Sequence, residues 1–151
     1  MKERSVTHAT FVIERSYRAT PQRVFAAFSD PAKKRRWFAG DKEFQPETFE
    51  MDFRVAGRER SSFQAQGVTC TNDTVYLDIV PDHRIVMAYT MTLGDRCISS
   101  SNATTEFLPT KKGTDLIFTE QAAFFEGADG AEMREEGWRK LLDNLGKALA
   151  H

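Results

Sequence analysis

The sequence predicts an α+β domain in which a curved antiparallel sheet of about six to seven strands wraps around a long C-terminal helix. Three observations support this fold class. Alternating apolar and polar residues, broken by short turn sequences, fill most of residues 48–124, as in an antiparallel meander. Two short helical segments follow the first strand-like segment. Residues 131–150 carry apolar side chains at helical spacing.

Length and composition indicate one soluble globular domain. A chain of 151 residues buries enough surface to fold alone, and we expect a single domain over residues 1–151. Hydrophobic residues make up 40% of the chain and charged residues 28%, which is typical of a folded protein. The formal net charge of −1 gives no field that would attract nucleic acid or an anionic membrane.

Targeting signals and cysteine usage predict a cytoplasmic protein. No apolar run approaches the roughly 20 residues that span a bilayer, and the segment Met1–Ser5 lacks the apolar core of a signal peptide. Cys70 and Cys97 are far apart and form no CxxC pair, so we expect two reduced thiols. We therefore expect no membrane association.

The first elements are a strand over residues 7–18 and two short helices. Thr20–Pro21 places an N-cap hydroxyl before a proline at the first helical position, and the helix that follows runs to Phe28. Asp30–Pro31 repeats the same arrangement and predicts a second helix that runs to about Trp37.

Six further strands are expected after these helices. Turn residues separate them, because glycine, proline, asparagine and aspartate favour turn dihedral angles. The turns are placed at Gly67 with Asn72–Asp73, at Pro81–Asp82, at Gly94–Asp95 and at Lys111–Gly113. The strands cover residues 48–55, 58–66, 75–80, 85–93, 97–108 and 115–124.

The final helix is predicted from Ala131 to Ala150, with Asp129 and Glu132 spaced as a capping box. Its charged residues, Arg134 among them, are assigned mostly to the solvent side. Gly137 costs about 1 kcal/mol relative to alanine, which indicates either a close helix–sheet contact or a bend. The apolar stripe consists of Trp138, Leu141, Leu142, Leu145 and Leu149.

These landmarks resemble a known family in their order along the chain. The matching segments are 11–15, 21–28, 30–31, 37–38, 52–55, 113–116, 119–121 and 137–138. Together they are similar to the activator of heat-shock protein 90 ATPase homologues, which belong to the START-like, helix-grip superfamily (SRPBCC). The resemblance implies a helix-grip fold. It also implies a cavity between the sheet and the last helix, because the superfamily includes polyketide cyclases and lipid-binding proteins.

A ligand site is expected in that cavity. Alternate residues of each strand face inward, and Tyr89 resembles a position where relatives place an inward aromatic residue. These residues would either wall a pocket or fill an ordinary core. The predicted ligand-binding residues are Trp37, Phe63, Met87, Tyr89, Met91, Ser101, Glu120, Trp138, Leu141 and Leu145.

Glu120 is the candidate polar anchor. It alternates with Leu116 and Phe118, so it faces inward if they do, and an inward carboxylate is costly to bury without a partner. It would orient a ligand or, in an enzyme, act as general base. Alternatively it is solvated or paired with an arginine near the sheet end. Ser101 either hydrogen-bonds a ligand or belongs to a polar sheet edge.

Three functions remain open. The first is a binding protein for a small apolar or amphipathic molecule. The second is a cofactor-free cyclase or hydrolase-like enzyme that uses the same cavity. The third, implied by the resemblance, is a co-chaperone-like module that stimulates a chaperone ATPase. Each is compatible with a homodimer. With only three histidines and no nucleotide or cysteine motif, we expect no metal and no cofactor. The basic run 33–36 lacks the interleaved aromatics of a nucleic-acid site.

Overall fold

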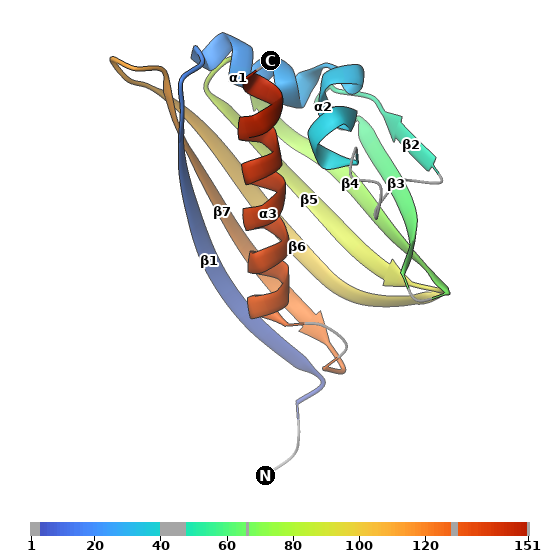
Figure 1. Cartoon of the computed structure of the whole chain (residues 1–151). Helices are drawn as coiled ribbons and strands as arrows, with labels where there is room; N and C mark the ends of the chain where they lie inside the picture. Colours follow the sequence, from blue (N-terminus) through green and yellow to red (C-terminus); the bar gives the residue numbers. More distant parts are fainter. Residues whose placement is uncertain (1–3, 40–47, 66, 128–129, 151) are drawn as a thin grey trace.

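Seven antiparallel strands form one sheet that curves around helix α3, with helices α1 and α2 at one end of it (Figure 1). The computed structural model describes residues 4–39, 48–65, 67–127 and 130–150. Their elements are β1 (Val6–Tyr17), α1 (Pro21–Ser29), α2 (Pro31–Phe38), β2 (Thr48–Met51), β3 (Arg58–Ala65), β4 (Val68–Val80), β5 (Arg84–Leu93), β6 (Arg96–Pro109), β7 (Thr114–Phe125) and α3 (Ala131–Leu149).

The strand order in the sheet is β1-β7-β6-β5-β4-β3-β2. Strands β2 to β7 therefore form a meander in which each strand pairs with its neighbour in sequence, while β1 lies beside β7. This architecture confirms the predicted α+β class, including the two short helices after the first strand and the long C-terminal helix against the sheet.

The first two helices begin as their sequences predict. The Thr20 side chain accepts a hydrogen bond from the Arg23 amide at 3.2 Å, and Asp30 Oδ1 accepts one from the Ala32 amide at 3.0 Å. A proline follows each cap, where no helical amide is needed. Helix α3 instead has Gly130 as its N-cap residue, which supplies no side-chain cap. The predicted cap Asp129 lies outside the described residues.

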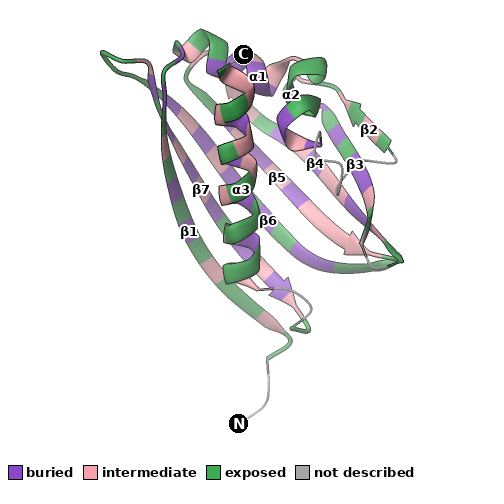
Figure 2. Ribbon diagram, viewed as in Figure 1, coloured by how far each residue is buried: buried purple, intermediate pink, exposed green. Residues whose placement is uncertain are grey.

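The core lies between the sheet and the helices, and burial alternates along much of β6 and β7 (Figure 2). Helix α3 contributes Trp138, Leu142 and Leu145, of which the two leucines are fully buried. Tyr17 OH donates a hydrogen bond to the Leu142 carbonyl oxygen at 2.7 Å and so ties β1 to α3. None of the described helices is both long and apolar enough to cross a membrane.

Two predicted boundaries are wrong. Strand β4 begins at Val68 rather than at residue 75, because Asn72 and the residues around it pair with both β3 and β5. Pairing on both sides overrides the turn preference of Asn72–Asp73. Strand β2 ends at Met51, and the chain then turns through Ala56, which has a φ of 69°.

Gly137 makes no close contact with the sheet. A Cβ atom at this position would meet no atom of the described residues within 4 Å, which excludes a close helix–sheet contact as the explanation for this glycine. The close approach of α3 to the sheet is nearer the C-terminal end of the helix, at Gly146, where a Cβ atom would lie 3.3 Å from Tyr17 Cε1.

Candidate functional site

A buried group of polar side chains lies on the inner face of the sheet against α3. We call it the central cluster. Strands β5, β6 and β7 supply its sheet side, and α3 supplies the rest. Its members are Tyr89, Ser99, Ser101, Glu120, Arg134 and Trp138. All six are buried.

Glu120 is the acceptor at the centre of the cluster, and its side chain is fully buried. The Tyr89 hydroxyl lies 2.7 Å from Oε1 and 2.8 Å from Oε2, and the Ser101 hydroxyl donates to Oε2 at 3.0 Å. Arg134 Nη1 is 3.4 Å from Oε2. Burial raises the pKa of Glu120 above its usual value, and these donors and the arginine charge oppose that rise.

Arg134 covers the cluster from α3. Its Nη1 donates to the Tyr89 hydroxyl at 3.0 Å and its Nη2 donates to Ser99 Oγ at 2.6 Å. The guanidinium carbon lies 5.5 Å from the centre of the Tyr89 ring and 5.3 Å from that of Phe124, within the range of cation–π attraction. The arginine is thus held by hydrogen bonds and by two aromatic rings.

Tyr89 links the carboxylate to the helix. Besides its contact with Glu120, its oxygen accepts a hydrogen bond from Trp138 Nε1 at 3.1 Å. Burial, followed by the nearby Glu120 charge, raises the pKa of Tyr89, so its hydroxyl keeps its proton and remains a donor. The Trp138 ring packs 4.3 Å from that of Phe118, centre to centre. The polar groups of the central cluster are therefore bordered by aromatic rings.

A second buried polar group lies where α2 meets the sheet, and we call it the α2 cluster. It consists of Lys34, Glu59 and Tyr76. Lys34 Nζ is 2.5 Å from Glu59 Oε1, and both residues are only 4% exposed. The Tyr76 hydroxyl donates to the same carboxylate oxygen. Burial and the Glu59 charge raise the pKa of Tyr76, which therefore stays protonated.

Five of the predicted site residues lie between the sheet and α3, at or beside the central cluster: Met87, Tyr89, Ser101, Glu120 and Trp138. Five others lie elsewhere in or around the core. Trp37 is buried between α1 and α2, where its Nε1 donates to the Ala27 carbonyl at 2.8 Å. Leu145 is fully buried, whereas Met91 and Leu141 are partly buried against the core. Phe63 is half-buried on β3.

Arg134 and the α2 cluster are absent from the site predicted from the sequence. Arg134 precedes Trp138 by four residues and therefore shares its helix face, a signal that its charge obscured. Lys34 likewise precedes Trp37 by three residues within a run of four basic residues. Ser99 and Ser101 are buried, so the alternative of an exposed polar edge is wrong for them.

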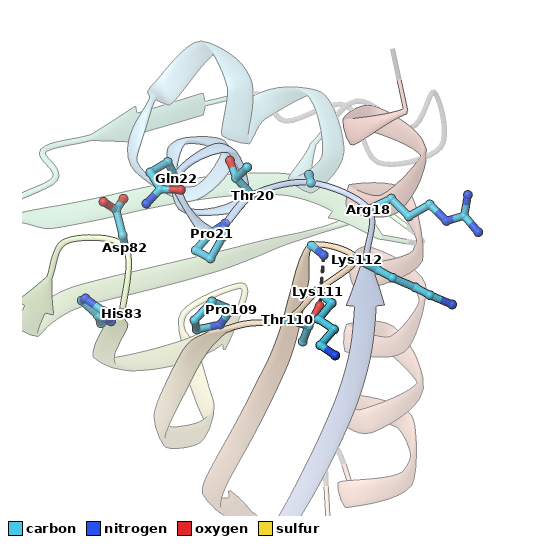
Figure 3. Close-up of a pocket in the computed structure, with 12 residues that line it drawn as sticks. Arg18, Thr20, Pro21, Gln22, Asp82, His83, Pro109, Thr110, Lys111 and Lys112 are labelled. Atoms are coloured by element: carbon cyan, nitrogen blue, oxygen red, sulfur yellow. Dashed lines mark hydrogen bonds between the residues drawn. The ribbon is translucent and has the colours of Figure 1, made fainter.

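Two pockets are lined mostly by residues outside the two clusters, and Ser101 of the central cluster borders the second. One, of about 470 Å³, is bounded by the start of α1, by the turn that holds His83 and by the end of β6 at Pro109 (Figure 3). The other, of about 640 Å³, is a shallow hollow over β1, β5, β6 and β7 that includes His8 and Gln121. A ligand cavity between the sheet and α3 stays a prediction.

The comparisons with known proteins agree with this fold. The family model described as Activator of Hsp90 ATPase homolog 1-like protein matches residues 18–150. No curated protein matches the chain. An uncharacterized protein from Rhizobium leguminosarum has 42% sequence identity and a TM-score of 0.93, with 99% of each chain covered.

Two further solved structures extend the comparison. The Mll3558 protein from Rhizobium loti has 47% identity and a TM-score of 0.88, with 96% of this chain and 99% of that chain covered. The AHSA1-like protein from Aeromonas hydrophila has 18% identity and a TM-score of 0.71, with 94% and 92% covered, and shows the same fold. The resemblance inferred from the sequence is thereby confirmed. With its family model matched over most of its length, the chain belongs to the Activator of Hsp90 ATPase homolog 1-like family and has a START-type fold.

Proposed function

We propose that this protein binds a small amphipathic molecule between the sheet and α3, with the polar group of the molecule at the central cluster. The observation that carries the proposal is the burial of Glu120 and Arg134 among hydroxyl groups, inside an aromatic surround. Ligand sites commonly combine apolar walls with a few convergent polar groups.

Stability alone is a poor reason for such a cluster. A buried ion pair contributes little compared with well-packed apolar residues of similar volume, because both charges lose their hydration. Glu120, Arg134 and two serines nevertheless occupy positions that leucine or phenylalanine could fill. The hydroxyl of Tyr89 and the guanidinium of Arg134 are groups that can exchange their mutual hydrogen bonds for bonds to a ligand.

A second candidate function is catalysis in the same place. The raised pKa of Glu120 brings a carboxyl group closer to the range of a general acid or base. In that case Glu120 moves a proton and Tyr89 supplies a hydrogen bond to the substrate. Glu120→Gln would then abolish turnover of a bound molecule while retaining its binding, whereas a pure binding protein shows no turnover to lose.

The family description also raises stimulation of an Hsp90-type ATPase. That function needs an exposed protein-docking surface and makes no use of the buried Tyr89 hydroxyl. A test of Tyr89 therefore separates it from ligand binding.

The test is a thermal-shift screen with amphipathic small molecules. A ligand at 100 times its Kd adds about 2.7 kcal/mol of stability, which raises the Tm of a domain of this size by roughly 5–10 °C. Tyr89→Phe should reduce the shift. Tyr17→Phe is the matched control, because it removes another buried hydroxyl that bonds α3 but contacts neither cluster. Equal shifts in both variants would refute the assignment to the central cluster.

A further inference from the structure

The two buried polar clusters share one row of the sheet. In the strand register Glu59 pairs with Thr74, Thr74 pairs with Tyr89, and Tyr89 pairs with Ser101, so the four side chains lie on the same face. All four are buried. Neighbouring strands are about 4.8 Å apart, which puts the backbones of Glu59 and Tyr89 roughly 10 Å apart. Only the small side chain of Thr74 stands between them in this row.

Aromatic rings from the helices also connect the two clusters. Lys34 Nζ lies 4.9 Å from the centre of the Phe38 ring, and that ring lies 6.2 Å from the Trp138 ring. Trp138 in turn donates its indole N–H to Tyr89. Phe38 and Trp138 thus form an apolar link from one polar cluster to the other.

Each cluster has its charges paired internally. The central cluster holds one cation, Arg134, beside Glu120, and the α2 cluster holds one cation, Lys34, beside Glu59. The hydroxyl groups around both carboxylates donate to them, as expected for ionised acceptors. A charged ligand group brought here would lack a counter-charge and would carry a large desolvation cost. An uncharged hydrogen-bonding group avoids that cost.

We propose that the ligand is an uncharged molecule with a hydroxyl or carbonyl group at each end and an apolar middle. One end bonds Tyr89 in the central cluster and the other bonds Tyr76 in the α2 cluster, while Phe38 and Trp138 pack on the middle. This inference rests on the proposed function. It adds a second polar contact and the requirement that the ligand be uncharged.

Four eight-carbon probes test the inference through their separate affinities for the protein: octanol, octanediol with a hydroxyl at each end, octanoate and octylammonium. Octanediol should bind about fivefold tighter than octanol, because a second buried hydrogen bond contributes on the order of 1 kcal/mol. Octanoate and octylammonium should bind more weakly than octanol. The affinities are measured by isothermal titration calorimetry at one pH and one salt concentration.

The variant Tyr76→Phe locates the second contact. It should cancel the advantage of octanediol over octanol, whereas Tyr17→Phe should preserve that advantage. If Tyr76→Phe does not fold, the four probes on the unaltered protein still decide the question.

The outcomes separate this inference from the function on which it rests. If octanol and octanediol bind equally, the two-ended ligand is refuted and the binding function stands. If octanoate or octylammonium binds tightest, the requirement for an uncharged ligand is refuted. If none of the four binds and the amphipathic screen also shows no shift, the proposed function itself fails.

Discussion

Removing one member of the α2 cluster should destabilise the protein more than removing all three. Lys34→Met would leave the Glu59 carboxylate buried, with the Tyr76 hydroxyl as the remaining partner that the structure describes. Breaking a buried ion pair in this way costs about 3–5 kcal/mol. Because the Tyr76 hydroxyl still bonds the Glu59 carboxylate, we expect Lys34→Met to lower the unfolding free energy by about 3 kcal/mol, the lower end of this range.

The triple variant Lys34→Met, Glu59→Leu and Tyr76→Phe removes every polar atom of the cluster's side chains. Apolar replacements of similar volume are often neutral or stabilising at buried ion pairs, so its unfolding free energy should stay within about 1 kcal/mol of the original. In a chain of this size, 1 kcal/mol corresponds to roughly 2–4 °C in Tm. The single variant should therefore melt roughly 10 °C lower and the triple variant close to the parent.

Urea unfolding followed by circular dichroism measures these differences. Lys33→Met is the matched control, because Lys33 is exposed on the same helix and its loss should change stability by less than about 0.5 kcal/mol. The reasoning is refuted if Lys34→Met costs no more than Lys33→Met. It is also refuted if the triple variant loses the sum of its three single changes.

Four other substitutions test the structure. Gly137→Ala should add about 1 kcal/mol of stability, because the new Cβ atom has no described neighbour within 4 Å. Gly146→Ala should stabilise the protein less, because its Cβ atom would lie 3.3 Å from Tyr17. Equal gains in Tm for the two variants would contradict this difference in packing. Asp30→Ala should cost about 1 kcal/mol through loss of the α2 cap, and an unchanged urea midpoint would count against that cap. Because the pKa of Glu120 is raised in the folded state, protonation favours folding. That contribution is present below about pH 4.5 and is lost as the pH rises through the folded pKa. Stability relative to Glu120→Gln should therefore fall as the pH rises above about 4.5, and a difference that does not vary with pH would refute the shift.

Much of the fold was predictable because its signals are local. Thr20 and Asp30, each followed by proline, fix the starts of α1 and α2 through hydrogen bonds within one turn of the chain. Strand β4 was mispredicted because the fate of Asn72 depends on partners in β3 and β5 that no local pattern specifies.

The candidate site was predictable on its sheet side only. Alternation along β7 places Glu120 inward whatever its partner. The burial of Arg134 depends on that carboxylate, 14 residues earlier in the sequence, and on the serine hydroxyls of β6. Sequence spacing cannot pair these groups, so a charged residue on a helix is assigned to solvent by default. The pairing of Lys34 with Glu59 is hidden for the same reason.

The sheet order has a consequence for how the chain folds. Every pairing from β2 to β7 can form as a local hairpin, but β1 pairs with β7, with Val6 opposite Phe125 and Tyr17 opposite Thr114. During synthesis β1 emerges before its partner, so its inward residues Phe11 and Ile13 remain uncovered until β7 has been made. Such long-range pairing slows folding. The β1–β7 seam is therefore where we expect the folding of nascent chains to be rate-limited and most dependent on chaperones.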